Sequence, residues 1–256
     1  MGSFLIKGGK ALKGALTPQG AKNEALQVIC ATLLTPEKVT ISNIPDIRDV
    51  NKLLDLIKCL GVTVTRESTA TYSFQAQHIN FEYLHSPQYI EKAEGLRGSI
   101  MIMGPLLARY GKCYIPSPGG DKIGRRRLVI HFKKNKKLGA RFVFDHKDNF
   151  YRVEGARLKG SYMLLEEASV TGTANIILAS VLAEGTTRIY NAACEPYVQQ
   201  LCRMLNSMGA DISGVGSNLL TIKGVKELGG CRHEILPDMI EVGSFIGLAA
   251  MNQSEV

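Results

Sequence analysis

The chain has 256 residues, 45% of them hydrophobic, and a formal net charge of +8, so it can bury one large core or two smaller ones and favours anionic partners. No stretch approaches the roughly 20 apolar residues that cross a bilayer, and the first ten residues lack a secretion-signal profile, which argues against a membrane protein and predicts a cytoplasmic location. The six cysteines form no C-x-x-C pair, so neither a metal site nor a disulfide framework is expected.

Similar segments recur along the chain. Ile41, Ile115 and Ile189 follow one another at intervals of 74 residues, which indicates an internal repeat of that length. Each repeat opens with an apolar helix pattern rich in small residues, followed by a turn and a short strand. The helices are expected at 22–34, 97–108 and 173–183, and the strands at 39–42, 112–115 and 186–190.

A second helix follows in the first and third repeats. Apolar residues at three- and four-residue spacing give it one apolar face, over 50–60 and 198–208. Gly61 and Gly209 stand where a left-handed C-cap is expected, and an alternating strand begins after each. Gly139 holds the same place in the middle repeat, where the helix carries a run of lysines. A hairpin is expected to finish each repeat, with turns near 147–149 and 214–218.

Repeats of this kind cannot bury their apolar faces singly. Three of them should therefore pack around a shared core with pseudo-threefold symmetry, which predicts an α/β fold with the helices richest in small residues innermost. A fourth helix pattern starts at 241–250, close to the last residue. We therefore expect a truncated portion of a longer protein with further repeats. The alternative is a frayed terminal helix on a complete domain.

The segment 118–127 places one carboxylate, Asp121, in a glycine-rich loop beside several cations. Glycines let the backbone approach a ligand closely, and guanidinium groups match phosphate and carboxylate oxygens, so the segment indicates acid chemistry on a phosphorylated substrate. A solvated surface loop is the simpler alternative. Nucleic-acid binding fits less well, because only Phe132 interrupts the cationic run and the chain has no tryptophan for base stacking.

Motifs spread over the whole chain resemble those of the enolpyruvyl transferases, most closely the members that act on UDP-N-acetylglucosamine. Besides the loop at 118–127, the resemblance rests on segments at 20–23, 96–99, 169–170, 183–187, 191–196 and 236–238. Several separated motifs in one order are far more specific than a single glycine pattern.

The resemblance implies an inside-out α/β barrel, built in the family as two similar domains of three repeats with the substrates between them. Residues 21–235 would form one complete three-repeat domain, and residues 1–20 and 236–256 would belong to an incomplete second domain. The implied reaction transfers the enolpyruvyl group of phosphoenolpyruvate to the 3-hydroxyl of UDP-N-acetylglucosamine, with release of phosphate and without a cofactor, as the committed step toward peptidoglycan. Activity on shikimate 3-phosphate is the alternative, although the loop resembles that branch less well.

By the same resemblance, Asp121 takes the position of the general acid that protonates the methylene carbon of phosphoenolpyruvate. The family usually has cysteine there, so insensitivity to fosfomycin is expected, because a carboxylate is a poorer nucleophile than a thiolate. An unperturbed aspartate, with a pKa of about 3.9, is ionised at neutral pH. Asp121 is therefore expected to act as an acid only in the closed, substrate-loaded complex. Lys22 is the second catalytic residue that the resemblance implies.

The resemblance also implies a set of substrate-binding residues. These are Lys22, Asn23, Arg97, Arg126, Arg127, Leu128, Val129, Ile130, Ser169 and Val170. The lysine, the asparagine and the arginines at 97 and 126 match contacts to phosphoenolpyruvate and the reaction intermediate, residues 127–130 match the uridine-binding segment, and residues 169–170 match nucleotide-sugar contacts. Val129 and Met239 stand where the family often has aspartate and arginine, and the first of these departures affects the details of nucleotide recognition.

The family's base and a further phosphoenolpyruvate-binding arginine correspond to sequence beyond Val256, so this chain alone is expected to be inactive. Two other interpretations stay open. One is a non-catalytic fragment that binds nucleotide sugar weakly or self-associates through an exposed half-cleft. The other is an unrelated phosphate-binding module.

Overall fold

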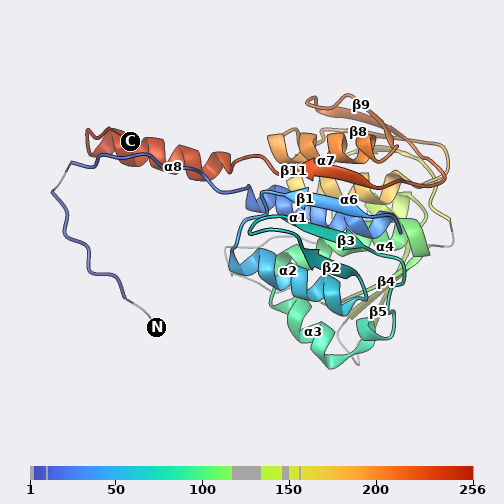
Figure 1. Ribbon diagram of the computed structural model, residues 1–256. Coiled ribbons are helices and arrows are strands. Elements are labelled where there is room, and N and C mark those ends of the chain that lie inside the picture. The colour runs from blue at the N-terminus through green and yellow to red at the C-terminus, as the bar shows by residue number, and fades with distance from the viewer. Residues whose placement is uncertain (1–2, 10, 117–133, 146–149, 156, 256) are drawn as a thin grey trace.

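Three helices lie at the centre of the fold, one from each sequence repeat (Figure 1). They are α1 (Lys22–Ala31), continued by the 3-10 turn η1 (Thr32–Leu34); the 3-10 helix η3 (Arg97–Ile102), continued by α4 (Met103–Tyr110); and α6 (Val170–Ser180). After the first residues of each central helix, most side chains are buried, because small residues let the backbones of the three helices approach one another closely. The computed structural model describes residues 3–9, 11–116, 134–145, 150–155 and 157–255.

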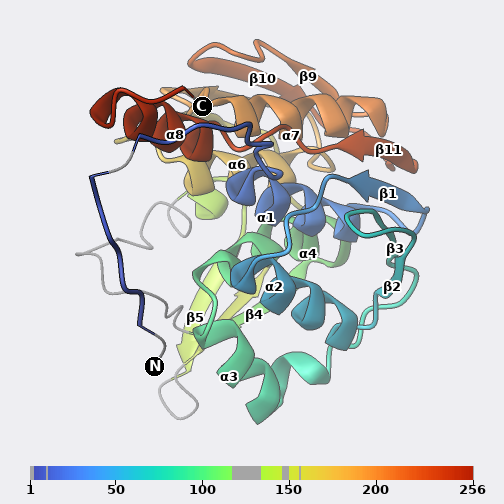
Figure 2. The same ribbon diagram turned by 60° about the vertical axis from the view of Figure 1, so that its left-hand side comes forward.

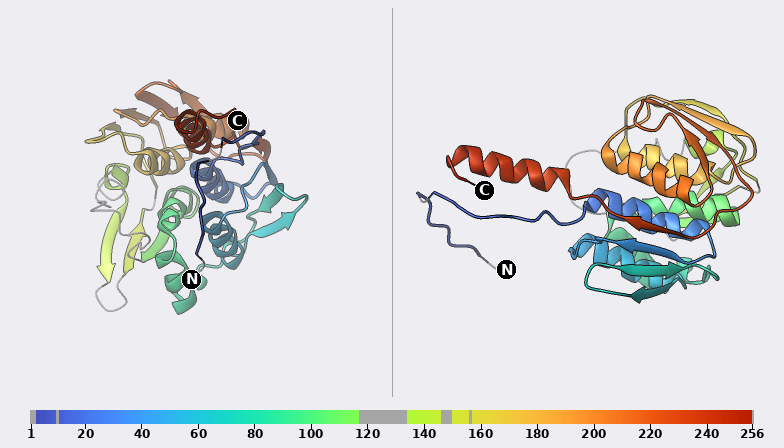
Figure 3. Two further views of the ribbon diagram at one scale, coloured as in Figure 1. Left: turned by 90° about the vertical axis from the view of Figure 1, so that its left-hand side faces the viewer. Right: turned by 45° about the horizontal axis from the view of Figure 1, so that its top comes forward.

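The sheets lie outside the central helices, as Figure 3 shows in the view along the helices. Each central helix leads into a first strand: β1 (Val39–Ser42), β4 (Lys112–Pro116) or β8 (Thr186–Tyr190). Ile41, Ile115 and Ile189 are buried in these strands. The arrangement confirms the repeat predicted from the 74-residue interval.

Each repeat ends in an antiparallel hairpin whose last strand pairs with the first strand of the same repeat. The hairpins are β2 (Thr63–Arg66) with β3 (Tyr72–Gln75), β5 (Arg141–Asp145) with β6 (Phe150–Glu154), and β9 (Asp211–Ser213) with β10 (Leu219–Lys223). The three sheets therefore share one order, β1-β3-β2, β4-β6-β5 and β8-β10-β9. In register, Ile41 lies opposite Tyr72 and Ile189 lies opposite Leu220.

Amphipathic helices precede two of these hairpins, as their spacing predicts. Helix α2 (Arg48–Cys59) and helix α7 (Pro196–Ser207) each bury one apolar face. Gly61 and Gly209 follow them with φ of 95° and 103°, and Gly139 has φ of 100° at the same place in the middle repeat. These values lie in the left-handed region that favours glycine, so the predicted caps are confirmed.

Two short parallel strands join neighbouring repeats and were not predicted. Strand β7 (Tyr162–Leu164), at the end of the second repeat, pairs with β8 of the third, and β11 (Cys231–Glu234), at the end of the third, pairs with β1 of the first. In β11 this pairing places His233 opposite Ile41. Strand β7 thus joins the second repeat to the third, and β11 joins the third repeat back to the first.

Two further details differ from the expectations. Helix α6 begins at Val170 rather than at residue 173, because the Ser169 hydroxyl accepts a hydrogen bond from the backbone N–H of Gly172 (3.2 Å) and caps the helix earlier. Between the first and second repeats the chain also forms a 3-10 turn, η2 (Tyr83–His85), and a short helix, α3 (Pro87–Glu94), for which the sequence analysis had no prediction.

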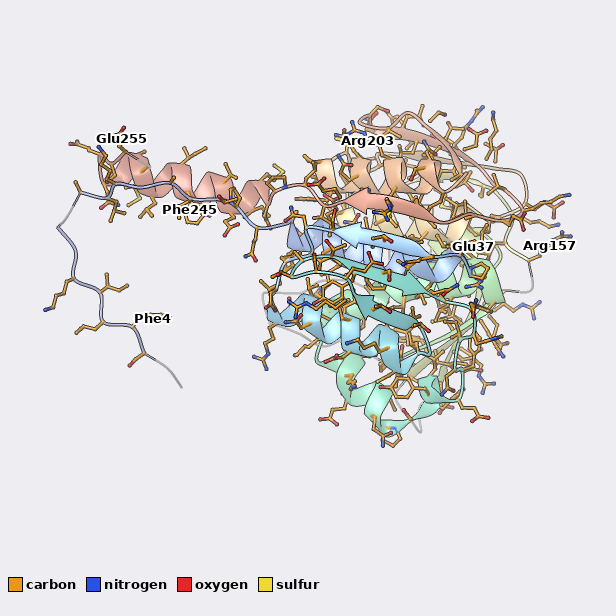
Figure 4. The ribbon with its side chains drawn as sticks, in the orientation of Figure 1. Phe4, Glu37, Arg157, Arg203, Phe245 and Glu255 are labelled. Atoms are coloured by element: carbon orange, nitrogen blue, oxygen red, sulfur yellow. The ribbon has the colours of Figure 1, made fainter. Side chains whose placement is uncertain are left out.

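Helix α8 (Met239–Met251) projects from the body beside residues 11–20 (Figure 4). The backbone N–H of Glu255 donates to the carbonyl of Leu12 (3.3 Å), and Leu16 and Phe245 line the same small pocket between the two segments. None of the residues of α8 is buried, although most are apolar. Within the described ranges, no helix combines the length and the apolar character that a membrane span requires.

The contact between α4 and α6 gives a prediction for stability. A Cβ at Gly104 would lie 2.6 Å from the carbonyl oxygen of Asn175, whose side-chain oxygen already accepts from the backbone N–H of Gly104 at 2.7 Å. Gly104→Ala is therefore expected to lower the free energy of unfolding by about 1–3 kcal/mol, measured by urea denaturation. Gly243→Ala is the control, because that helical glycine of α8 has open space around its Cβ position. Equal stability of the two variants would contradict the prediction.

Candidate functional site

The three central helices run in the same direction. Their C-terminal ends meet around one pocket, which is lined by Leu34, Tyr110 and Ala183 among others. Their N-terminal ends therefore lie together at the opposite end of the body, where the chain enters α1 and later leaves toward α8 (Figure 2). Five of the predicted site residues lie on these N-terminal ends.

Each of these residues opens a central helix. Lys22 and Asn23 are the first two residues of α1, Arg97 is the first residue of η3, and Ser169 and Val170 are the N-cap and first residue of α6. All five are partly exposed, whereas the helices behind them are buried. The other predicted residues, Asp121, Arg126, Arg127, Leu128, Val129 and Ile130, lie outside the described residues.

This end of the body is suited to anions. The first N–H groups of a helix lack partners within the helix, and the helix dipole places partial positive charge there. Neither Ala21 before α1 nor Leu96 before η3 provides a side-chain cap. The cations of Lys22 and Arg97 add full charge to the same region, a combination that binds phosphate and carboxylate groups.

Two aspartates hold the start of α1 in place. The Lys22 ammonium lies 3.5 Å from Oδ2 of Asp49, in the first turn of α2, and the two side chains are 44% and 46% exposed. The backbone N–H of Lys22 donates to Oδ2 of Asp238 at 3.2 Å, while Oδ1 of Asp238 accepts from the backbone N–H of Ile240 at 2.9 Å. Asp238 therefore links the beginnings of α1 and α8, and neither aspartate was among the predicted site residues.

A third carboxylate near this end is buried. Glu24, the residue after Asn23, contacts His233 of β11. The sequence contains one signal for it, an acid placed directly after the Lys22–Asn23 motif in a helix whose following residues are mostly apolar. Which partner it has could not be read from the sequence, because the two residues are more than 200 positions apart.

The pocket at the opposite end, about 1310 Å³, holds none of the predicted site residues. Four cationic and four acidic side chains line it, including Glu37 and Arg157 (Figure 4). Its Arg109 donates to the carbonyls of Leu33 (3.1 Å) and Ala76 (2.7 Å), and partial burial lowers the pKa of that guanidinium. Arg109 thus stabilises the C-terminal end of the first central helix, which is a structural role.

The buried cysteines are unsuited to nucleophilic or acid chemistry. Cys30, Cys113 and Cys202 are buried, and burial raises the pKa of each thiol. They pack as small apolar residues. Within the part of the chain that the structure describes, no group of three or more His, Cys, Asp or Glu side chains could hold a metal ion.

The sequence matches the family model described as EPSP synthase (3-phosphoshikimate 1-carboxyvinyltransferase) over residues 6–256. Two curated relatives are named UDP-N-acetylglucosamine 1-carboxyvinyltransferase: that of Bacteroides thetaiotaomicron is 62% identical and that of Porphyromonas gingivalis 58% identical, both over all of this chain. The chain spans 59% of the length of each of these relatives.

Solved structures share the fold at low sequence identity. The enolpyruvyl transferase NikO from Streptomyces tendae matches with a TM-score of 0.79 and 20% identity, over 94% of this chain and 56% of that one. EPSP synthase from Acinetobacter baumannii matches with a TM-score of 0.70 and 22% identity, over 95% and 54%. These matches confirm the predicted fold class.

Proposed function

Because the chain belongs to the EPSP synthase family, we propose that it provides one half of an enolpyruvyl transferase that acts on phosphoenolpyruvate and UDP-N-acetylglucosamine. The observation that carries the proposal is the meeting of three helix N-termini at one end of the body, with Lys22, Asn23, Arg97 and Ser169 on them. The high identity to relatives named for this reaction supports the choice of substrates.

The reaction would proceed by addition and elimination. A base takes the proton of the sugar 3-hydroxyl as its oxygen adds to the central carbon of phosphoenolpyruvate, while an acid protonates the methylene carbon. The base is proposed to come from the remaining length of the relatives. Phosphate then leaves as the resulting methyl group gives up a proton, which yields the enolpyruvyl ether. Asp121 is proposed as the acid, and Lys22 and Arg97 as the cations that balance the phosphate and carboxylate charge. Ser169 and Val170, with Arg127, Leu128, Val129 and Ile130, are proposed to bind the nucleotide sugar, and Asn23 and Arg126 to bind phosphoenolpyruvate.

The same proposal assigns the residues of the chain to two domains. Residues 21–235 would be one domain, and residues 1–20 and 236–256 would belong to a second domain that needs the remaining length of the relatives. The unburied apolar surface of α8 supports this division, because an apolar helix is normally covered. The substrates are metabolites, so a cytoplasmic location and no nucleic-acid or membrane partner are part of the proposal.

Phosphate release from phosphoenolpyruvate and UDP-N-acetylglucosamine tests the function. The assay compares this chain with a version extended to the full length of its relatives. Activity only in the extended protein supports the transferase and the division into two domains. An extended protein that is folded but inactive with UDP-N-acetylglucosamine and active with shikimate 3-phosphate would show the other branch of the family, the alternative that the names of the most similar relatives support less well. Inactivity with both would leave a non-catalytic binding fragment.

A further inference from the structure

Two buried ionisable side chains connect α1 to the strand that leads out of the body. Oε1 of Glu24 lies 2.8 Å from Nε2 of His233, and these side chains are only 1% and 8% exposed. The other oxygen, Oε2, accepts a hydrogen bond from the backbone N–H of Leu236 at 3.2 Å. A buried carboxylate is unfavourable unless it is fully partnered, and here both of its oxygens have partners.

Leu236 belongs to the crossing segments, defined as residues 19–21 entering the body and 235–238 leaving it, and His233 lies in β11 just before the outgoing one. These segments lie side by side: the backbone N–H of Ala21 donates to the carbonyl of Leu236, and that of Asp238 donates to the carbonyl of Gln19, both at 2.8 Å. A Cβ at Gly20 would lie 1.8 Å from the carbonyl oxygen of Asn43, so no larger residue fits there. Movement of the crossing segments would therefore be transmitted to the start of α1.

We propose that the Glu24–His233 pair is a positioning element that fixes the first turn of α1 against the crossing segments and so sets the direction of Lys22 and Asn23. This inference rests on the proposed function. Successive residues of a helix are separated by about 100° of rotation, so holding Glu24 toward the core turns Asn23 and Lys22 about 100° and 200° away from it. That rotation agrees with the partial exposure of both side chains.

The Glu24–His233 pair is better suited to fixing the geometry of neighbouring elements than to stabilising the fold. Well-packed apolar side chains in place of a buried ion pair are often equally stable. An apolar pair, however, has no directional bonds. Glu24 fixes two bonds at once, one to a side chain of β11 and one to the backbone of the outgoing crossing segment, and this sets the spacing of three elements.

The test uses the full-length enzyme with both partners replaced, Glu24→Leu/His233→Leu. Removing both partners together leaves no unpaired buried charge, so the thermal midpoint should stay close to that of the unmodified enzyme. We expect kcat to fall about 10- to 100-fold, because a misplacement on the order of 1 Å at reacting groups has effects of that size. Glu24→Gln should keep kcat within about fivefold, since an amide can donate to one tautomer of histidine and accept from Leu236.

Gln27→Leu is the matched control. Gln27 lies three residues further along α1, is 2% exposed, and has no hydrogen-bond partner for Oε1. It makes no hydrogen bond to the crossing segments among those of the described residues. The polar-to-apolar change is therefore similar, and kcat should not change. A loss of kcat in this variant equal to that of the double variant would overturn the proposal.

Hydrogen–deuterium exchange provides a readout that does not depend on activity. Peptides covering 19–23 and 234–238 should exchange about tenfold faster in the double variant, and at the unmodified rate in Gln27→Leu. Unchanged kcat and unchanged exchange in the folded double variant would overturn the positioning role. If the unmodified enzyme releases no phosphate, the proposed function fails, and exchange alone decides the positioning role. Should the double variant not fold, His233→Asn, whose amide is too short to reach Glu24, takes its place. The same changes in kcat and exchange support or contradict the proposal, although the thermal midpoint should fall because Glu24 loses a partner.

Discussion

Asp121→Asn in the full-length enzyme is expected to lower kcat by about two to four orders of magnitude, the range that removal of a general acid produces. An asparagine side chain keeps the size and polarity of the aspartate but has no proton that it can transfer to carbon. Phosphate release at saturating phosphoenolpyruvate and UDP-N-acetylglucosamine measures the effect. Normal turnover of a folded Asp121→Asn enzyme would refute the acid role of this residue.

Asp121→Cys is the control for the same position. A thiol can also donate a proton, so this variant should keep turnover well above that of Asp121→Asn. It should also become sensitive to fosfomycin, because a thiolate attacks an epoxide far more readily than a carboxylate does. The unmodified enzyme should remain insensitive. Stoichiometric covalent labelling of Asp121 by fosfomycin would contradict this part of the prediction.

The repeat architecture could be predicted because local signals determine it. The small-residue helices and the glycines after the second helices are signals that act within a few residues, and their recurrence with Ile41, Ile115 and Ile189 every 74 residues reveals the repeat. The structure confirms these elements, and the shift of the α6 start also has a local cause in the Ser169 cap. Agreement between local patterns and the global fold is what allows a sequence to be interpreted in this way.

The strands that join the repeats could not be predicted. Strand β11 has the sequence Cys-Arg-His-Glu, which lacks an alternating apolar pattern, and β7 has only three residues. They form because the edges of β1 and β8 are available for parallel pairing. That availability depends on tertiary structure, because β11 and β1 are far apart in the sequence.

The candidate site likewise contains residues that could be predicted from the sequence and residues that could not. Lys22, Asn23, Arg97, Ser169 and Val170 were found by motif, and the structure places them on helix N-termini at one end of the body. The residues that hold them were not among the predicted site residues, although Asp238 lies in the 236–238 motif. Asp49, Asp238, Glu24 and His233 act through contacts between distant segments, and no spacing rule relates such positions.

Lys22→Met is the second substitution with a large expected effect. Methionine keeps most of the apolar stem of lysine and removes the charge, so only the ammonium is tested. In the proposed reaction this ammonium balances charge on phosphoenolpyruvate. We expect kcat/KM for phosphoenolpyruvate to fall about 10²- to 10³-fold, as is typical when a group that stabilises transition-state charge is removed.

Lys38→Met separates this loss from the loss of an ion pair. Lys38 lies beyond the other end of the first central helix and pairs with Glu67 at 2.8 Å, and its hydrogen bond holds the pKa of that carboxyl below its usual value. Both lysines thus form one partly exposed ion pair each, of a kind that contributes little to stability. The two variants should therefore unfold at similar temperatures, while only Lys22→Met loses activity.

Two outcomes would contradict the role of Lys22. An equal loss of activity in Lys22→Met and Lys38→Met would show that the loss comes from the lower net positive charge of the protein rather than from a lost contact to the substrate. Full activity of Lys22→Met would remove Lys22 from the proposed mechanism and leave Arg97 as the proposed phosphoenolpyruvate-binding cation on the described helix N-termini.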